Sequence, residues 1–307
     1  MSLPSAITAV GLSRSFGAFG AVNKLDLSVE RGELYGLVGP DGAGKTTTMR
    51  LLAGILEPTA GDARVAGISL RDDPEGIKAH IGYMSQRFGL YEDLTVMENI
   101  LFYADLYDVE LKERPGRIER LLTFSGLAPF QKRLAGALSG GMKQKLGLAC
   151  ALVHTPEVLL LDEPTNGVDP VSRRDFWRIL YDLLREGVAI FLSTSYLDEA
   201  ERCTRIGLIH QGRIILEGEP LKVRSSLNVP MIELWTDRVR EAGAQAREMG
   251  GVKEVTVYGD RLHISLDQRA GAASVIEHFS RTGIAVLDHR EILPSLEDVF
   301  IAAVRNS

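Results

Sequence analysis

One short segment of the sequence carries the residue types that bind phosphate groups. Residues 39–46 read Gly-Pro-Asp-Gly-Ala-Gly-Lys-Thr and match the pattern G-x-x-x-x-G-K-[ST]. Glycines let backbone N–H groups converge on an anion, and a helix beginning there adds positive potential. Lys45 can then reach the β- and γ-phosphates of a nucleotide, and the Thr46 hydroxyl can ligate Mg²⁺. An ordinary glycine-rich turn is the alternative, but the apolar strand before the loop and the helix after it favour a phosphate-binding loop.

A second segment places two acids at the end of an apolar run. Residues 158–161 read Val-Leu-Leu-Leu, and Asp162 and Glu163 follow directly. A carboxylate at the end of a parallel strand beside a phosphate loop suits a Mg²⁺-associated Asp. Glu163 could orient or deprotonate an attacking water. Alone, the segment would predict only a strand followed by a solvated acidic turn, so the interpretation depends on its pairing with the loop.

A third segment, Leu138-Ser139-Gly140-Gly141, precedes a helical pattern. A hydroxyl and free N–H groups at the positive end of a helix form another site shaped for phosphate. By itself the segment indicates no more than an N-cap.

The elements that must position these segments are strands alternating with helices. Apolar runs at residues 33–38, 158–161, 188–194 and 206–210 predict buried strands, and residues 46–53 and 170–185 predict helices. Such alternation indicates a mostly parallel sheet covered on both faces. Residues 6–30 predict an antiparallel pair of strands, and residues 86–156 a helical insertion with helices at 96–107, 117–125 and 141–153.

The sequence changes character after Val223. Strands are predicted at 231–236, 252–258, 261–266 and 284–287, and helices at 238–249 and 270–281. This is the β-α-β-β-α-β order of a small ferredoxin-like α+β domain. A last helix, capped by Ser295, presents Leu296, Val299 and Phe300 on one face.

Composition excludes several classes of protein. The 307 residues include 35 Lys and Arg against 41 Asp and Glu, a formal charge of −6, which argues against a nucleic-acid coat. Two cysteines, Cys150 and Cys203, provide neither a disulfide framework nor a metal quartet, which is typical of an intracellular chain. No apolar run approaches the roughly 18 residues of a membrane span, and residues 1–4 begin no signal peptide. We therefore expect membrane contact only through a partner.

Taken together, the three segments strongly resemble the ATP-binding cassette (ABC) ATPases, the motor subunits of ABC transporters. The resemblance covers about residues 6–223 and implies a P-loop NTPase fold: a mixed sheet core, an antiparallel β subdomain and an inserted helical subdomain that docks on a membrane partner. It also implies ATP and Mg²⁺ as ligands and a second cassette bound head to tail. We expect the ATPase domain at residues 1–224, with the helical subdomain at about 86–156, and an accessory domain at 225–307.

The resemblance implies roles for individual residues. Gln86 matches the glutamine that joins the subdomains and approaches Mg²⁺ and the attacking water, and Phe16 matches the aromatic residue that stacks on adenine, although it could equally be a core residue of an edge strand. Asp169 matches an acid of the dimer-contacting loop. The expected catalytic residues are Glu163, Gln86 and Ser195, and the expected metal ligands are Thr46, Gln86 and Asp162. The expected nucleotide contacts are Phe16, Gly39, Pro40, Asp41, Gly42, Ala43, Gly44, Lys45, Thr46, Thr47, Ser139, Gly140, Gly141, Gln144 and Asp169.

Finer features narrow the resemblance to ATPases of the ABC-2 class of exporters, such as the drug-exporting DrrA and YbhF types. These features are residues 88–99, Phe-Gly-Leu-Tyr-Glu-Asp-Leu-Thr-Val-Met-Glu-Asn, and the terminal Pro-Ser-Leu-Glu-Asp-Val-Phe at 294–300. The class implies separate integral membrane permease subunits, a drug-like or lipid-like substrate, and a place in the cytoplasm on the inner face of the cell membrane.

One residue departs from the family pattern. Where the family has a switch histidine, residues 191–200 place Ser195, whose hydroxyl is much shorter than an imidazole. The serine puts hydrolysis in doubt but not ATP binding, so a regulatory cassette with weak hydrolysis is the alternative. A soluble cassette that acts on nucleic acid is a further alternative. The net charge and the single cassette, without basic linker or coiled coil, argue against it.

Overall fold

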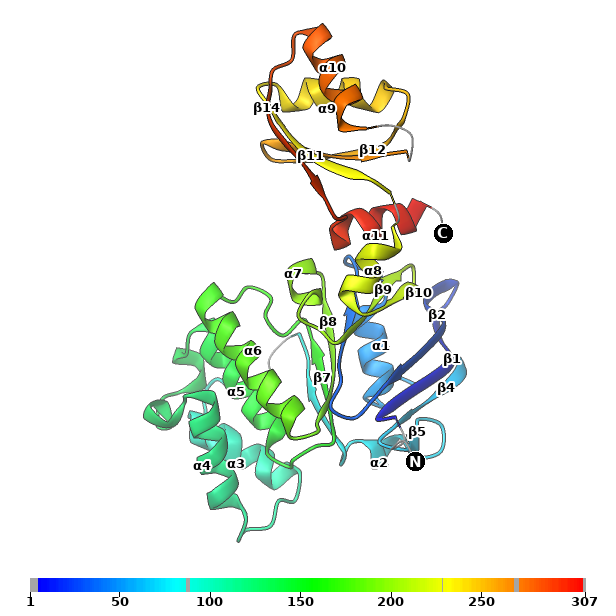
Figure 1. Ribbon diagram of the computed structural model, residues 1–307. Coiled ribbons are helices and arrows are strands. Elements are labelled where there is room, and N and C mark those ends of the chain that lie inside the picture. Colours follow the sequence, from blue (N-terminus) through cyan, green and yellow to red (C-terminus); the bar gives the residue numbers. More distant parts are fainter. Residues whose placement is uncertain (1–4, 87–88, 228, 268–270, 306–307) are drawn as a thin grey trace. The chain divides into compact units, whose positions relative to one another are not determined.

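The computed structural model describes residues 5–86, 89–227, 229–267 and 271–305. Its internal contacts divide the chain into two compact units, Met1–Glu219 and Pro220–Ser307 (Figure 1). The boundary predicted after residue 224 falls within helix α8 (Pro220–Ser226), the first element of the second unit.

The larger sheet of the first unit is parallel except at one edge. Its strand order is β10-β9-β3-β8-β7-β6, and only β10 runs antiparallel to its neighbour. The central strands are buried at every position, as expected for a sheet covered on both faces. The strands are β3 (Leu34–Val38), β6 (Ile81–Met84), β7 (Val158–Asp162), β8 (Ala189–Thr194), β9 (Arg205–His210) and β10 (Arg213–Gly218).

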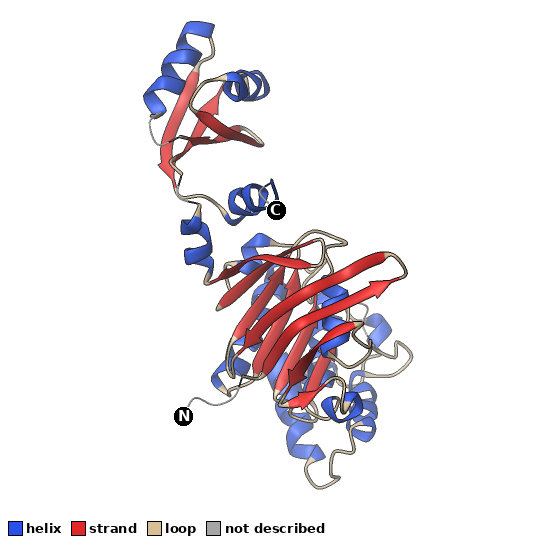
Figure 2. Ribbon diagram, turned by 90° about the vertical axis from the view of Figure 1, so that its right-hand side faces the viewer, coloured by secondary structure: helices blue, strands red, loops and turns tan. Residues whose placement is uncertain are grey.

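The second sheet of this unit is antiparallel, with the order β2-β1-β4-β5. The expected pair of strands at residues 6–30 is β1 (Ile7–Phe16) and β2 (Phe19–Val29). The sequence did not predict β4 (Ala60–Val65) or β5 (Ile68–Ser69), which complete the sheet. Figure 2 shows the long strands of this sheet crossing in front of the parallel strands.

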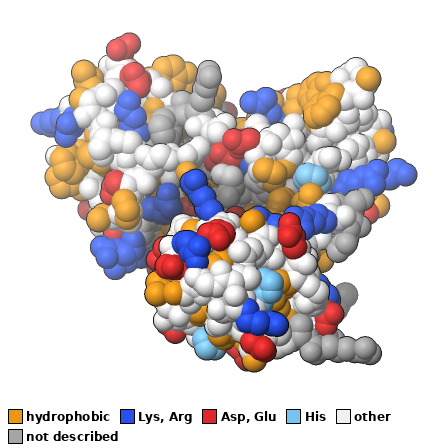
Figure 3. All heavy atoms as spheres, turned by 90° about the horizontal axis from the view of Figure 1, so that it is seen from above, with side chains coloured by type: hydrophobic (Ala, Val, Ile, Leu, Met, Phe, Trp, Pro, Cys, Tyr) orange, Lys and Arg blue, Asp and Glu red, His pale blue; other side chains and the backbone are white. Residues whose placement is uncertain are grey.

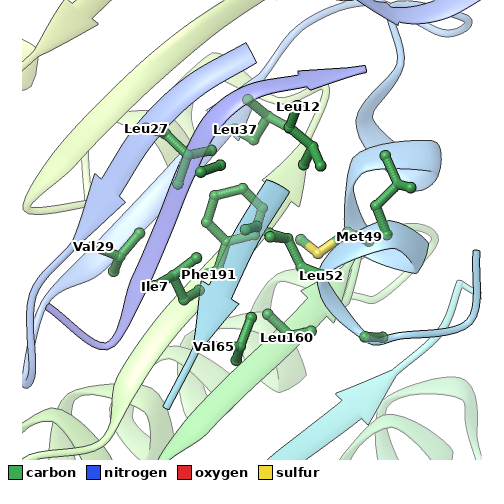
Figure 4. Close-up of a cluster of buried hydrophobic side chains, with 14 of the residues drawn as sticks. Ile7, Leu12, Leu27, Val29, Leu37, Met49, Leu52, Val65, Leu160 and Phe191 are labelled. Atoms are coloured by element: carbon green, nitrogen blue, oxygen red, sulfur yellow. The ribbon is translucent and has the colours of Figure 1, made fainter. Parts of the chain in front are cut away.

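The core of the first unit joins the two sheets and helix α1 (Lys45–Leu52). In Figure 4, Leu12 and Leu27 from the antiparallel sheet point toward Leu37 and Phe191 of the parallel sheet. All four side chains are buried. Met49 and Leu52 add one face of α1, so burial of apolar surface fixes the helix that follows the glycine-rich loop.

The inserted region is helical. Its α-helices are α3 (Val96–Leu106), α4 (Arg114–Ser125) and α5 (Gly140–Leu152), with 3₁₀ turns at Ala128–Phe130 and Ala135–Ala137. Thr95 and Glu98 form a capping box that begins α3. Three further helices, α2 (Pro74–Ile77), α6 (Pro170–Arg185) and α7 (Leu197–Ala200), lie outside this region.

The second unit has the predicted ferredoxin-like order. Its antiparallel sheet runs β12-β13-β11-β14, which in chain order is 2-3-1-4. The last strand, expected at 284–287, instead spans β14 (Val286–Ile292) because it pairs along the whole of β11. The other elements are β11 (Met231–Thr236), α9 (Val239–Glu248), β12 (Val252–Tyr258), β13 (Arg261–Leu266), α10 (Ala272–Thr282) and α11 (Leu296–Arg305).

The surface carries charges of both signs. Figure 3 shows Lys and Arg interspersed with Asp and Glu on the face in view. Among the described residues, no helix combines the length and the apolar composition that crossing a bilayer requires.

Candidate functional site

The glycine-rich loop joins the buried strand β3 to helix α1, as its pattern predicts. Gly44 caps the helix with φ of 109°, and a Cβ there would lie 2.5 Å from the carbonyl oxygen of Ala21. A Cβ on Gly39 would collide with the carbonyl oxygen of Ile209. Both positions therefore exclude any side chain, and glycine there allows the tight backbone path of a phosphate-binding loop.

Lys45 is buried at the start of α1, with 5% of its surface exposed. Its ammonium donates to the carbonyl oxygens of Gly39 at 2.7 Å and Pro40 at 3.0 Å. It also pairs with Glu163 Oε1 at 3.1 Å. Two loop carbonyls and the carboxylate of Glu163, which is distant in sequence, thus converge on one cation, which is placed to meet phosphate oxygens entering the loop.

Asp162 ends strand β7 beside the loop and is 1% exposed. The Thr46 hydroxyl donates to Asp162 Oδ1 at 3.2 Å, and the Ser193 hydroxyl donates to the same atom at 2.6 Å. Asp162 Oδ2 is buried without a hydrogen-bond partner among the described residues. A hydroxyl and a carboxylate with a free oxygen are hard donors that suit Mg²⁺, which takes few protein ligands and completes its shell with water and phosphate.

Glu163 adopts a positive φ of 48°, which turns its side chain away from the strand direction. Its backbone N–H donates to the Ser193 hydroxyl at 3.0 Å. Its Oε2 accepts from Gln86 Nε2 at 3.2 Å and from Asn166 Nδ2 at 3.3 Å. The carboxylate, only 8% exposed, is thus held by three donors at the position predicted for a general base.

These groups line one cleft with a volume of about 580 Å³. Its wall includes Ser195, which is exposed, as well as the loop residues Asp41, Gly42, Gly44, Lys45, Thr46 and Thr47. The other lining residues are Phe19, Ala21, Gln86, Glu163, Asn166 and Tyr196. A cleft of this size accommodates a nucleotide.

The predicted adenine-stacking residue lies beside this wall rather than in it. Phe16 pairs with Phe19 at the end of the β1–β2 hairpin, and Arg14 covers its ring at 4.8 Å. Phe19 is the aromatic residue of the hairpin that lines the cleft, and 64% of its surface is exposed. The role of Phe16 stays a prediction.

Ser139 and its neighbours lie outside the lining of this cleft. Ser139 caps α5, accepting a hydrogen bond from the Met142 backbone N–H at 3.3 Å, and Ser139 and Gly140 are exposed. Gly141 packs so closely on Ser172 of α6 that a Cβ would collide with it, and Gln144 is buried. The N-terminus of α5 is therefore exposed and does not contribute to the cleft of this chain.

Asp169 caps the neighbouring helix α6. It accepts from the backbone N–H groups of Ser172 at 2.9 Å and Val171 at 3.1 Å. These hydrogen bonds, that from Ser172 first, lower the pKa of its carboxyl. Asp169 therefore stays ionised and fixes the loop that joins Glu163 to α6.

Several residues of the site had no signal in the sequence. Asn166 was noted only as part of the loop before Asp169, whereas Tyr196, Ser193 and Glu199 carried no motif. They are brought together because β7 and β8 are adjacent parallel strands whose carboxyl ends meet at one edge. Although no motif marks these residues, their position near the end of a predicted buried strand could have identified them. Phe88, the first residue of the segment typical of ABC-2 ATPases, lies outside the described residues.

The two cysteines are packing residues, as predicted. Both are buried, and burial raises the pKa of each thiol. They are therefore protonated and unreactive at neutral pH.

Comparisons with known proteins agree with this geometry. Residues 22–166 match the family model described as "ABC transporter", and residues 218–304 match the "ATP-binding protein DrrA1-3-like, C-terminal domain". A solved "ATP binding subunit of ABC transporter" is 30% identical, with a TM-score of 0.67 over 73% of this chain and 94% of that one. The dimeric cassette MJ0796 is 25% identical, with a TM-score of 0.64 over 69% and 98%.

Curated relatives extend the likeness to both units. The probable multidrug ABC transporter ATP-binding protein YbhF of Escherichia coli (strain K12) is 44% identical over 96% of this chain and 51% of its own length. The daunorubicin/doxorubicin resistance ATP-binding protein DrrA of Streptomyces peucetius is 35% identical over 97% and 92%. The chain thus spans about half the length of YbhF and nearly all of DrrA. It belongs to the ABC transporter ATP-binding protein family, with a DrrA-like C-terminal domain.

Proposed function

We propose that this chain binds and hydrolyses Mg-ATP as the energy-supplying subunit of an ABC-2 type exporter. The observation that carries the proposal is the convergence of Lys45, Asp162 and Glu163 on one cleft beside the glycine-rich loop. A buried cation, a carboxylate with a free oxygen and a held base are the groups that phosphoryl transfer to water requires. We assign ATP binding to residues 1–224 and an accessory role to 225–307.

The chain's own groups divide the work of hydrolysis. The ammonium of Lys45 and the loop N–H groups bind the phosphates and stabilise charge that develops on them. Thr46 and Asp162 would hold Mg²⁺, which when bound neutralises phosphate charge and orients the terminal phosphate. Glu163 accepts the proton of the attacking water while Gln86 helps to orient its carboxylate. Since Lys45 also contacts Glu163, phosphate binding and base placement are linked.

The partners follow from the family and from the exposed Ser139. We infer that a second cassette supplies its own Ser139 segment to this cleft, because the Ser139 segment of this chain does not line it. DrrA is named for daunorubicin and doxorubicin resistance, and another relative for bacitracin transport. We therefore propose a drug-like or lipid-like substrate that crosses separate permease subunits, with this chain on the cytoplasmic face.

Ser195 supports one alternative function. It lines the cleft at the position where the family has a longer histidine side chain, so a mainly regulatory cassette that binds ATP and hydrolyses it slowly is the second candidate. Steady-state ATPase activity of the purified chain distinguishes the two functions.

Reconstitution tests the exporter. The tagged chain is purified with the membrane proteins that accompany it and placed in sealed vesicles. We expect ATP-dependent movement of a fluorescent anthracycline, lost in Lys45→Ala and kept in Lys112→Ala, whose exposed side chain pairs with Glu110 at 2.6 Å. ATP turnover without transport would overturn the exporter but leave the ATPase.

A further inference from the structure

We propose that Tyr196 is a positioning residue for ATP hydrolysis: its hydroxyl acts through Asn166 to hold the Glu163 carboxylate. The inference rests on the proposed function and names a device within the same cleft. It concerns residues that follow two different strands, β7 and β8, and meet only in the fold.

Asn166 links the two side chains in a defined orientation. Its Nδ2 donates to Glu163 Oε2 at 3.3 Å, and its Oδ1 accepts from the Tyr196 hydroxyl at 3.2 Å. A carboxylate only accepts hydrogen bonds, so the amide must turn its NH₂ toward Glu163 and its oxygen toward Tyr196. The phenol then donates, and it fixes the amide that fixes the base.

Two contacts, one to the backbone and one to the ring, hold Tyr196 in place. Its backbone N–H donates to the Thr194 hydroxyl at 3.0 Å. The Arg173 guanidinium of α6 lies over its ring, 5.0 Å from the centroid. A cation over an aromatic face is attracted to it, which favours this one position of the ring.

A buried glutamate anchors the groups that hold the ring. Glu199, 1% exposed, accepts from Thr194 at 2.7 Å and from Thr165, the residue before Asn166. Arg173 approaches the same carboxylate at 3.7 Å. One carboxylate thus ties together the end of β8, the loop after Glu163 and helix α6. These contacts restrict the movement of Tyr196 relative to Asn166.

The link accounts for a cleft that has Ser195 where a histidine is expected. The structure gives Ser195 no hydrogen bond to Glu163, whereas its neighbour Tyr196 reaches that carboxylate in two steps. Positioning of the base is therefore supplied by the residue after Ser195. Phosphate binding does not depend on this link, because Lys45 contacts Oε1 of Glu163 whereas Asn166 contacts Oε2.

The test is steady-state ATPase kinetics of the full chain with Tyr196→Phe, Asn166→Ala and the double variant. Tyr196→Phe keeps the ring under Arg173 and removes only the hydroxyl. We expect each single variant to lower kcat roughly tenfold or more, because misplacing a catalytic group is costly, and to change the KM for ATP by less than about twofold. The double variant should be no slower than Asn166→Ala, because both substitutions break one link.

Tyr181→Phe is the matched control. Its hydroxyl donates to the carbonyl oxygen of Arg202 at 3.4 Å, and 36% of its side chain is exposed, the same fraction as in Tyr196. It should leave kcat unchanged. If Asn166→Ala does not fold, Asn166→Asp keeps the shape but replaces the donor with a carboxylate that repels Glu163, so it should lower kcat at least as much.

The outcomes separate the link from the proposed function. A wild type that turns over ATP at the rate of Tyr196→Phe, or a double variant whose losses multiply, would overturn the link and leave the ATPase intact. A wild type that binds Mg-ATP without turnover would overturn the proposed hydrolysis and the link with it. A raised KM at constant kcat would make Tyr196 a binding residue and also overturn the proposal.

Discussion

At the scale of single residues, the site is built around buried charge. Lys45 and Glu163 are both less than a tenth exposed and lie 3.1 Å apart. Burying one of them without the other would be strongly unfavourable, because desolvation then has no compensating partner. Each charge therefore needs the other when the cleft is empty, and Lys45 has phosphate as a further partner when nucleotide is bound.

Lys45→Ala tests the phosphate-binding role. A hydrogen bond to a charged group is worth about 1.5–3 kcal/mol, so losing this cation should weaken Mg-ATP binding by about ten- to a hundredfold. The variant should be less stable because Glu163 loses its buried cation, but the fold should persist, since Gln86 and Asn166 still donate to that carboxylate. Calorimetry measures the affinity, with Lys112→Ala as the control. Unchanged binding would show that the loop is not a phosphate site.

Ser195→His tests the departure from the family pattern. A histidine there would add a polar contact to phosphate or water of the kind that commonly contributes a few kcal/mol to a transition state. We expect kcat to rise by about tenfold, which corresponds to about 1.4 kcal/mol, with little change in nucleotide affinity. Steady-state ATPase activity measures this, with Glu163→Gln as the background. A fast wild type that the histidine leaves unchanged or slows would show that the serine is an adapted part of the site.

At the scale of elements, the sequence was most informative where apolar runs are continuous. Strands β7 and β8 are buried throughout and were predicted from their apolar runs. Strand β4, in contrast, reads Ala-Gly-Asp-Ala-Arg-Val and has no clear apolar–polar alternation. Its position is fixed by pairing with β1. Pairing between distant segments is what the local sequence does not contain.

The same limit applies to the site. Lys45, Asp162 and Glu163 were found because motifs mark them. Asn166 and Tyr196 are brought together by the adjacency of β7 and β8 and by the positive φ of Glu163. Neither feature leaves a spacing in the sequence, since the two segments are separated by a whole helix, α6.

Within the second unit, His263 of β13 joins the sheet to helix α11. Its Nε2 lies 3.3 Å from Glu233 Oε1 and its Nδ1 lies 3.3 Å from Asp298 Oδ2. A neutral imidazole has a single N–H, so only the protonated ring can donate to both carboxylates. Burial opposes the charge, but hydrogen bonds to Asp298 and Glu233 outweigh it and raise the pKa of His263 above 6.5.

The two carboxylates respond in the opposite direction. Burial raises the pKa of Glu233, but Arg290, His263 and Arg261 outweigh it and lower it. Burial likewise raises the pKa of Asp298, and His263 with Ser295 lowers it. The aromatic ring of Tyr258 also packs on His263, at 4.3 Å between centroids. The cluster is therefore strongest where the ring is protonated and both acids are ionised.

This predicts a pH dependence for α11. The stabilisation by His263 is complete below 6.5 and is lost as pH rises through its raised pKa; the stabilisation by the acids is present above about 4.5 and is lost on acidification. Hydrogen exchange of the peptide that contains α11, corrected for intrinsic rates, should show protection falling as the pH rises above 6.5 and through the raised pKa of His263. In His263→Gln this fall should disappear, whereas exposed His289→Gln should retain it. An equal fall in both variants would rule the cluster out.

At the scale of the whole molecule, we propose that the chain holds two half-sites rather than one complete site. The cleft contains the phosphate loop, Asp162 and Glu163, and the exposed Ser139 caps a helix that does not line it. The N-terminus of α5 is exposed although Gln144 in the same helix is buried. We propose that this helix end contacts the cleft of another cassette. Two copies related by a two-fold axis would complete both sites at once.

The assembly is tested by slowing hydrolysis and blocking contact separately. Glu163→Gln removes the base but keeps a side chain that fits the cleft, so ATP should persist between two cassettes and favour a dimer, measured by light scattering with Mg-ATP and with Mg-ADP. Ser139→Arg in that background should abolish the dimer, because it places bulk and a cation at the helix end that must approach phosphate. Lys132→Ala, an exposed surface change, should leave it intact.

A Glu163→Gln chain that stays monomeric at high concentration, alone and with its membrane partner, would contradict the head-to-tail pair. ATP-dependent dimerisation that survives Ser139→Arg would place the contact on another surface, and the exposed end of α5 would then have no assigned ligand.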